Sequence, residues 1–530
     1  MKREEIDNVD EFLKIVNIDP LNTRIIKIND DHFQVLLASV NMNTQTHFHN
    51  KKRIDIVRGD FSPFLRRVTQ NLQEALNYTA NSYQEQMIKY YIEHFQSGDI
   101  EMHKNSQRSW IRDKGPIVET NIGFIESYLD PKQVRAEWEG FSAIVNKNES
   151  EKTHNFVKNA EKCLKMMPWP QEFEKDQFLK PDFTSLDVIQ NGASMTFAGI
   201  NIPNYDDIRQ NEGFKNVYLK NCIHSRKKAD QNFCLIDQEI MKTYGDQVVF
   251  HQVIYHELLG HGCGKLFYLK DEQTQSYNFD IENTVNPLNG QKITTFYKEQ
   301  DTWMSVFQNL SNPYEECRAD CVALYFSCFE ESFSFLQPEF LSEWQNINKA
   351  CFLDLISQGI NGLQFYDVNE KKWGQAHING RWVILQVLLE IGEDFLQIQK
   401  CLKEHDEEGI EIKLNKDLIL TKGKEALSQF LLKMQVYKST ADYQSASKMF
   451  NKYSEVSEKF LQIRDIVIKN KKPRRVELQG HLSLDSNKKV VYTCFQESFE
   501  GIIESYMARY PYFDLEMYNL FMFYREYNRN

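Results

Sequence analysis

The feature that most constrains this chain is the stretch "VIYHELLGHGCGKL", residues 253–266, in which two histidines and a glutamate lie close together. His261 follows His256 by five residues. Each residue of an α-helix turns by about 100°, so side chains four apart lie about 40° apart around the axis, whereas side chains five apart lie about 140° apart. A regular helix therefore cannot direct both imidazole rings to one point. Either the pairing is accidental or the helix is distorted here.

The residue types favour a metal site. H-E-x-x-H is a zinc-binding signature in which the glutamate acts as general base. Glu257 directly follows His256, so this chain carries that pattern with one residue added. A catalytic zinc ion also needs a third protein ligand and one open position.

A second acidic stretch can supply the third ligand. It is "SNPYEECRADCVAL", residues 311–324. We expect Ser311 or Asn312 to cap a helix that begins here. Glu316 and Asp320 are four apart and would share one helix face.

The alternative is an exposed helix start, where acidic residues suit the positive end of the helix dipole. Because the histidine stretch lies upstream, we favour Glu316 as a metal ligand. Glu315 and Asp320 would then orient the histidine rings, as carboxylates do around many metal sites.

Length and composition limit the functional classes. A chain of 530 residues is long enough for two or more domains. The formal charge of −12 argues against nucleic acid as the main partner. The opening "MKREEIDNVDEF" has no apolar segment typical of a secretion signal, and no stretch is long and apolar enough to span a membrane. We therefore expect a cytoplasmic protein without a membrane partner.

Hydrophobic periodicity predicts a mainly helical α+β chain. Residues 20–60 contain short alternating or β-branched runs that indicate strands. Residues 61–105 and most of 235–470 have the three- and four-residue spacing of helices. A further strand is expected around 195–200, before a turn at Pro203.

HELLGH followed by EECRAD resembles the pair of motifs that marks the dipeptidyl peptidase III family, which are zinc-dependent aminodipeptidases. Further stretches look like segments of the same family in the same order, among them "GPIVETNIGFIESYLDP", "GINIPNYDDIRQNEGFKN" and "QAHINGRWVIL". The resemblance covers roughly residues 20 to 480.

The resemblance implies two lobes around a wide cleft. A mixed lobe with a β-barrel-like core would comprise residues 1–140, 184–230 and 474–530. A helical lobe that carries the zinc site would comprise residues 141–183 and 231–473. The resemblance also implies that a widened turn absorbs the extra residue, as single π-type bulges do at functional sites. Gly260 would give the backbone freedom for that turn.

Site roles follow residue by residue from the resemblance. His256, His261 and Glu316 would bind one Zn²⁺ per chain, and Glu257 would act as general base and acid. His377 would stabilise the transition state, and Arg381 would contact the substrate.

An enzyme that removes two residues must also bind the substrate ammonium at a fixed distance from the metal. The resemblance assigns this task to Glu119, with Asn201 and Asn204 contributing, and places Asp182 and Arg209 near the cleft. The strand around 195–200 would pair with an extended peptide.

Three departures from the family pattern affect these expectations. Asn121 stands two residues after Glu119, where the family has a tyrosine, so we expect a lower kcat. Asp320 replaces a glutamate, so its hold on a histidine could be direct, water-bridged or absent. Family members also have a longer N-terminal region, so part of the mixed lobe is expected to be missing.

The sequence thus predicts a monomeric zinc peptidase that removes dipeptides from short peptides with a free N-terminus. Two alternatives remain: a peptide-binding scaffold with weakened catalysis, and a zinc aminopeptidase with a different cleavage register.

Overall fold

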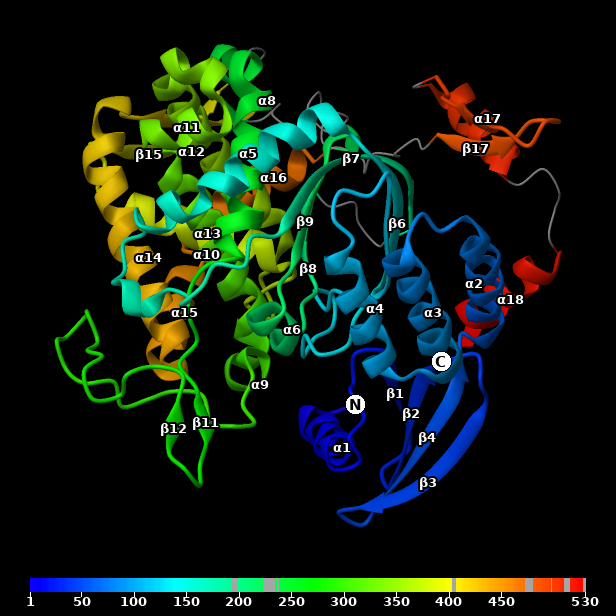
Figure 1. Cartoon of the computed structure of the whole chain (residues 1–530). Coiled ribbons are helices and arrows are strands. Elements are labelled where there is room, and N and C mark those ends of the chain that lie inside the picture. Colours follow the sequence, from blue (N-terminus) through cyan, green and yellow to red (C-terminus); the bar gives the residue numbers. More distant parts are fainter. Residues whose placement is uncertain are drawn as a thin grey trace.

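A curled sheet of five strands forms the side of the mixed lobe that faces the helical lobe (Figure 1). The computed structural model describes residues 1–192, 198–222, 234–235, 238–402, 407–471, 480–496, 498–509 and 515–527. The strand order is β5-β6-β7-β9-β8, and only β7 and β9 run parallel. The strands are β5 Val118–Phe124, β6 Trp138–Val145, β7 Asp182–Asn191, β8 Gly199–Ile202 and β9 Lys215–Leu219. Residues 195–197 of the predicted strand lie outside the described residues.

The mixed lobe adds a four-stranded sheet with the order β1-β2-β4-β3. Its strands are β1 Thr23–Asn29, β2 His32–Ala38, β3 Asn43–His49 and β4 Lys52–Asp60. Helix α1 covers this sheet through a small apolar core. A second core joins the five-stranded sheet to the neighbouring helices. The helices of this lobe are α1 Arg3–Ile15, α2 Ser62–Ala75, α3 Ser82–Ser97, α4 Ile100–Arg112 and α6 Asp206–Asn211. The strands predicted in residues 20–60 and the helices predicted in 61–105 are confirmed.

The helical lobe has its own large apolar core. Helices α8, α10, α12 and α13 pack against one another within it. The helices are α5 Lys147–Leu164, α8 Gln238–Tyr255, α9 Trp303–Phe307, α10 Ser311–Phe326, α11 Glu330–Leu336, α12 Trp344–Asn361, α13 Ala376–Leu389, α14 Lys424–Ser439, α15 Tyr443–Ser454 and α16 Glu458–Lys469. Short strands interrupt the predicted helical stretch: β10 Cys234–Leu235, β11 Leu269–Asp271, β12 Ser276–Tyr277, β13 Tyr366–Asp367, β14 Lys372–Trp373, β15 Leu396–Leu402 and β16 Glu408–Leu414. The predicted class, mainly helical α+β with two lobes, is confirmed.

The C-terminal segment returns to the mixed lobe. It contains β17 His481–Leu484, β18 Val490–Thr493, α17 Phe499–Arg509 and α18 Leu515–Tyr527. Helix α18 lies beside α2, and Tyr524 stacks on Phe61 with ring centroids 5.1 Å apart (Figure 1). The predicted lobe boundaries stay a prediction. Within the described ranges, no helix has the length and apolar character needed to cross a bilayer.

A cavity of about 1400 Å³ opens between the two lobes. From the mixed lobe it is lined by α1, β8 and the segment that follows β5. From the helical lobe it is lined by residues of the HELLGH stretch, α10, α13 and α15. The two predicted metal-binding motifs therefore face the strand that was expected to bind peptide.

Candidate metal centre and its cleft

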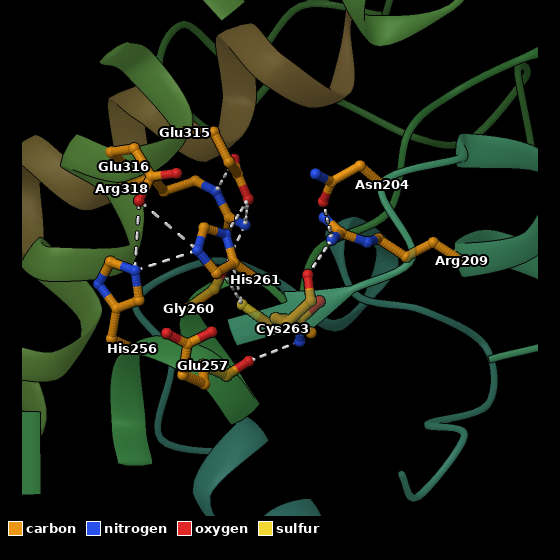
Figure 2. Close-up of polar contacts among 12 residues, drawn as sticks. Asn204, Arg209, His256, Glu257, Gly260, His261, Cys263, Glu315, Glu316 and Arg318 are labelled. Carbon is orange, nitrogen blue, oxygen red and sulfur yellow. Dashed lines mark hydrogen bonds and ion pairs between the residues drawn. The ribbon is translucent and has the colours of Figure 1, made fainter. Parts of the chain in front are cut away.

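The helix that carries the HELLGH stretch widens where the extra residue is inserted. Helix α8 ends at Tyr255, and His256–Gly260 forms a π-helical turn. The amide of His261 donates to the carbonyl of His256, five residues back, at 3.0 Å. The Nε2 atoms of the two histidines consequently lie 3.0 Å apart (Figure 2). The predicted widened turn is confirmed.

Gly260 serves a close approach between two helices. A Cβ atom at this position would lie 2.7 Å from both Cα and Cβ of Ala319 in α10. Real Cβ atoms essentially never come that close. The glycine therefore allows the widened turn to pack closely against α10. The sequence suggested Gly260 for its backbone freedom, and the structure adds this packing requirement.

Helix α10 begins at Ser311 without a side-chain cap. The position before the helix is Leu310, and the Ser311 hydroxyl instead donates to the carbonyl of Gln308 at 2.6 Å. The predicted cap at Ser311 or Asn312 is wrong, because a short 3₁₀ turn over Gln308–Leu310 leads directly into the helix. The register of α10 still turns Glu316 toward the two histidines.

His256, His261 and Glu316 converge on one point (Figure 2). Oε2 of Glu316 lies 3.2 Å from Nε2 of His256 and 3.6 Å from Nε2 of His261. That oxygen is buried and accepts no hydrogen bond from any residue that the structure describes. Zinc–nitrogen bonds of about 2.0–2.1 Å in a tetrahedral site put neighbouring ligand atoms roughly 3.4 Å apart. The two imidazoles and the carboxylate therefore fit a zinc ion.

Each histidine is oriented by its own carboxylate. Nδ1 of His256 lies 2.8 Å from Asp320, and Nδ1 of His261 lies 3.2 Å from Glu315. The shorter side chain of Asp320 thus reaches its histidine directly. Arg381 donates from Nε to the other oxygen of Asp320 at 2.9 Å. Such partners fix the ring orientation of metal-binding histidines.

Glu257 is buried beside the histidines and lines the cavity. Burial raises the pKa of Glu257 to about 8, although the neighbouring His256 opposes the rise. Burial alone would also raise the pKa of Glu316, but His377, His261 and His256 together lower it to about 2. Their environments therefore shift the two pKa values in opposite directions, so that Glu257 can hold a proton and Glu316 stays ionised.

His377 and Tyr128 complete the centre from opposite lobes. Nε2 of His377 lies 3.1 Å from Oε2 of Glu316, and its ring meets that of Tyr128 edge-on at 5.2 Å. The Tyr128 hydroxyl donates to Oε1 of Glu316 at 3.1 Å. Tyr128 was not predicted from the sequence. The signal that could have found it is the Glu-x-Tyr spacing of Glu126 and Tyr128, which is the spacing expected for the family tyrosine.

Glu119 and Asn121 lie on the face of β5 that is turned toward α4. Glu119 accepts a hydrogen bond from Trp110 and pairs with Lys215 at 2.9 Å. Asn121 donates to Gln107 at 2.9 Å. Neither Glu119 nor Asn121 lines the 1400 Å³ cavity. Strand alternation points the Asn121 side chain into the core beneath α4, so the structure gives no support to the expected effect of Asn121 on kcat.

Asp182 lies in the same buried region as Glu119. It accepts from the amide of Gly115 at 2.6 Å and lies 3.2 Å from His154. Burial would raise the pKa of Asp182, but the contacts with His154, Gly115 and Lys215 hold it below its ordinary value. Asp182 is absent from the cavity wall.

Asn201, Asn204 and Arg209 line the cavity. Asn201 donates to the backbone carbonyl of Glu257 at 2.8 Å, which connects β8 to the HELLGH turn. Arg209 donates to the Asn204 side chain at 2.8 Å (Figure 2). Asn204 in turn donates to Glu126 at 2.9 Å. Glu126, which was also not predicted, thus lies in the cavity at the end of this polar chain.

Comparison with known proteins identifies the family. The sequence model described as Peptidase family M49 matches residues 1–510. The chain is 42% identical to dipeptidyl peptidase 3 from Nematostella vectensis and 39% identical to that from Homo sapiens; each match covers 96% of this chain and 72% of the relative.

Solved structures share the fold. The structure of DPP III from Caldithrix abyssi superposes with a TM-score of 0.58 at 20% identity, covering 88% of this chain and 77% of that one. Dipeptidyl-peptidase III from Corallococcus sp. strain EGB gives a TM-score of 0.59 at 17% identity, over 81% of this chain and 71% of that one. The family match, the close relatives and the histidine–carboxylate cluster lead to one conclusion: this chain is a peptidase and belongs to peptidase family M49, the family of the dipeptidyl peptidase III proteins.

Proposed function

We propose that this protein is a zinc-dependent dipeptidyl peptidase that removes dipeptides from the free N-termini of short peptides. The observation that carries the proposal is the convergence of His256, His261 and Glu316 beside Glu257 in the cavity. The three side chains would hold one zinc ion, which when bound would polarise the scissile carbonyl and lower the pKa of a water molecule to about 7.

The side chains around this point have distinct proposed tasks. Glu257 would accept a proton from the attacking water and return it to the departing amine. The Tyr128 hydroxyl and the His377 ring face the same carboxylate from two sides, so both can stabilise negative charge that develops on the substrate. Asp320 and Glu315 would keep the two histidine rings in place.

Strand β8 is the proposed binding edge for the peptide backbone. It pairs with β9 on one side, and its residues line the cavity. Backbone hydrogen bonds at a sheet edge tolerate many side chains, as an enzyme that acts on varied peptides requires. Asn201, Asn204 and Arg209 would hold this edge and contact the first two substrate residues.

We assign the substrate ammonium to Glu126 in place of Glu119. Glu126 lines the cavity, whereas Glu119 is already neutralised by Lys215 outside it. Burial, with Glu316 nearby, raises the pKa of Glu126 to about 7, so an incoming cation would relieve an unfavourable environment. A substrate N-terminus bound by Glu126, on the mixed-lobe side of the metal, would determine how many residues separate that N-terminus from the cleaved bond.

Paired arylamide substrates test the proposal. One carries a free dipeptide and the other a single amino acid, and Glu257→Gln serves as the inactive control. The expected result is chelator-sensitive release from the dipeptide substrate alone, restored by zinc. Release from the single amino acid would instead support an aminopeptidase. A zinc-loaded protein that binds peptides without cleaving either substrate would support the scaffold alternative.

The Glu126 assignment has its own test, in which N-acetylation removes the substrate ammonium. The parent enzyme should prefer the free dipeptide substrate over its acetylated form by ~10²-fold or more in kcat/KM, because a buried carboxylate loses its charged partner. Glu126→Gln should lose most of that preference. A preference that persists in Glu126→Gln and disappears in Glu119→Gln would return the role to Glu119.

The cellular setting is part of the proposal. The net charge of −12 disfavours nucleic acid partners. The buried cysteines of the described structure are free thiols, which suits the reducing cytoplasm; they are Cys163, Cys263, Cys317, Cys321, Cys328 and Cys351. We propose a cytoplasmic monomer, without a membrane partner, whose partners are its peptide substrates.

A further inference from the structure

Arg318 is a fully buried guanidinium beside the proposed metal centre, and it does not line the cavity. Its relative exposure is 0%, and it lies two residues after Glu316 in α10. Burying a charge is costly unless it is paired and hydrogen-bonded. Arg318 satisfies this requirement through Glu315, the Gly260 carbonyl and Cys263 (Figure 2). It also donates to the side chain of Gln435.

One of these groups is a carbonyl that the helix leaves without its regular partner. In an α-helix the carbonyl of Gly260 would accept from the amide of Gly264. The Gly264 amide instead donates to Glu174 at 2.7 Å, because the chain leaves the helix after the widened turn. Nη2 of Arg318 donates to the Gly260 carbonyl in its place. The guanidinium thus acts as the cap of the widened turn.

The same guanidinium also holds the carboxylate that orients His261. Nε and Nη2 of Arg318 donate to the two oxygens of Glu315 at 3.0 and 2.7 Å. Glu315 then contacts Nδ1 of His261 at 3.2 Å. Lys438 approaches the same carboxylate, so Glu315 carries two cationic partners. One rigid group therefore connects the backbone just before His261 with the partner of its ring.

We propose that Arg318 is a positioning residue that sets the zinc affinity of this enzyme by fixing the widened turn and the His261 ring together. It touches neither substrate nor the reacting atoms. Its planar fork reaches the carbonyl and both carboxylate oxygens at once, which the single ammonium of lysine cannot do. The inference rests on the proposed metal site and adds a residue that would determine how tightly the site holds its ion.

Arg318→Lys is the decisive variant, with Gln435→Leu as its matched control. Gln435 is a fully buried Arg318 partner whose side chain hydrogen-bonds Arg318 and Ser439 and, among the described residues, neither Gly260 nor Glu315. Zinc affinity is measured by competition with a chelator of known affinity. Cobalt(II) is then loaded instead of zinc, and its visible absorption spectrum reports the arrangement of the ligands. Thermal unfolding of the metal-free proteins measures the fold separately.

Arg318→Lys should bind zinc ~10–100-fold more weakly and show an altered cobalt spectrum, as expected for loss of an outer partner of a metal ligand. Gln435→Leu should keep the parental affinity and spectrum even if its Tm falls. Parental affinity and spectrum in Arg318→Lys, or equal losses of affinity in both variants, would overturn the proposal. So would an Arg318→Lys protein that stays unfolded in excess zinc, because Arg318 would then support the fold as a whole. A parent that binds no zinc would refute the proposed function itself.

Discussion

The Tyr128 hydroxyl and the Glu316 carboxylate, 188 residues apart in the sequence, meet at 3.1 Å between the two lobes. Tyr128 follows β5 in the mixed lobe, and Glu316 belongs to α10 in the helical lobe. Burial, with Glu126 and Glu316 close by, raises the pKa of Tyr128 well above its ordinary value. The hydroxyl therefore stays a proton donor at neutral pH, in the wall of the cavity.

Tyr128→Phe should lower kcat by ~10²–10³-fold, the loss expected when a donor to developing negative charge is removed. Steady-state kinetics on the dipeptide substrate measure the change. Tyr244→Phe is the control, because Tyr244 also donates to a glutamate, Glu343, but lies outside the cavity wall. An unchanged kcat in Tyr128→Phe would remove Tyr128 from the proposed mechanism.

Asn121→Tyr should bring no gain in kcat. The sequence alone suggested that this change would restore a missing tyrosine, but Asn121 is buried against Gln107 beneath α4. A larger side chain there should destabilise the protein by about 1–3 kcal/mol through overpacking. Thermal unfolding and kcat of the same preparation check both parts, and a faster enzyme would show that Asn121 reaches the cleft.

Asp320→Ala should weaken zinc binding by ~10–100-fold, because His256 loses its carboxylate and Arg381 its partner. Asp320→Glu keeps the charge and should stay close to the parental affinity. Competition with a chelator compares the three proteins. Equal affinities in all of them would mean that the histidine ring is held by its packing alone.

Gly199→Ala should reduce kcat by ~10-fold or more, since small displacements of a catalytic group are costly. A Cβ atom at Gly199 would lie 2.9 Å from the Glu257 carboxylate and 2.7 Å from Val253. Gly245→Ala in the same helix as Val253 is the control, because its Cβ would meet no atom of the described part of the chain within 4 Å. If both alanine variants retain the parental kcat, the close approach of Gly199 to Glu257 is not required for catalysis.

Asp55 should make stability depend on pH in the acid range. Burial alone would raise its pKa, but hydrogen bonds from Arg53, Thr46 and His32 lower it from 3.8 to about 2. A carboxylate with a lowered pKa contributes stability that is complete above about pH 4 and is lost as the pH falls toward 2. The contribution is about 2 kcal/mol.

The measurement compares thermal unfolding of the parent and Asp55→Asn at pH 7, 5 and 3. The difference in Tm should be constant between pH 7 and 5 and smaller at pH 3. A difference that does not change over this range would mean that the carboxylate charge contributes nothing and that shape alone explains the effect of the substitution.

The sequence by itself determined the candidate metal-binding residues and the class of fold. His256, Glu257 and His261 lie within six residues, and Glu315, Glu316 and Asp320 lie within six others. Their relations are therefore fixed by the geometry of two short helical segments. The extra residue in HELLGH had to widen the turn if both rings were to bind one ion, and the structure contains that turn. Helical periodicity likewise predicted most of the helices, whereas alternation predicted only the strands of residues 20–60 and the strand before Pro203.

Tertiary structure decided which residues of the other segments face the cleft. Strand alternation puts Glu119 and Asn121 on one face of β5, but only packing against α4 and pairing with Lys215 turn that face into the core. Glu126 and Tyr128 follow the strand and reach the cavity. In the same way, the Arg381 side chain is directed by its hydrogen bond to Asp320. These choices depend on partners distant in the sequence, and no local spacing encodes them.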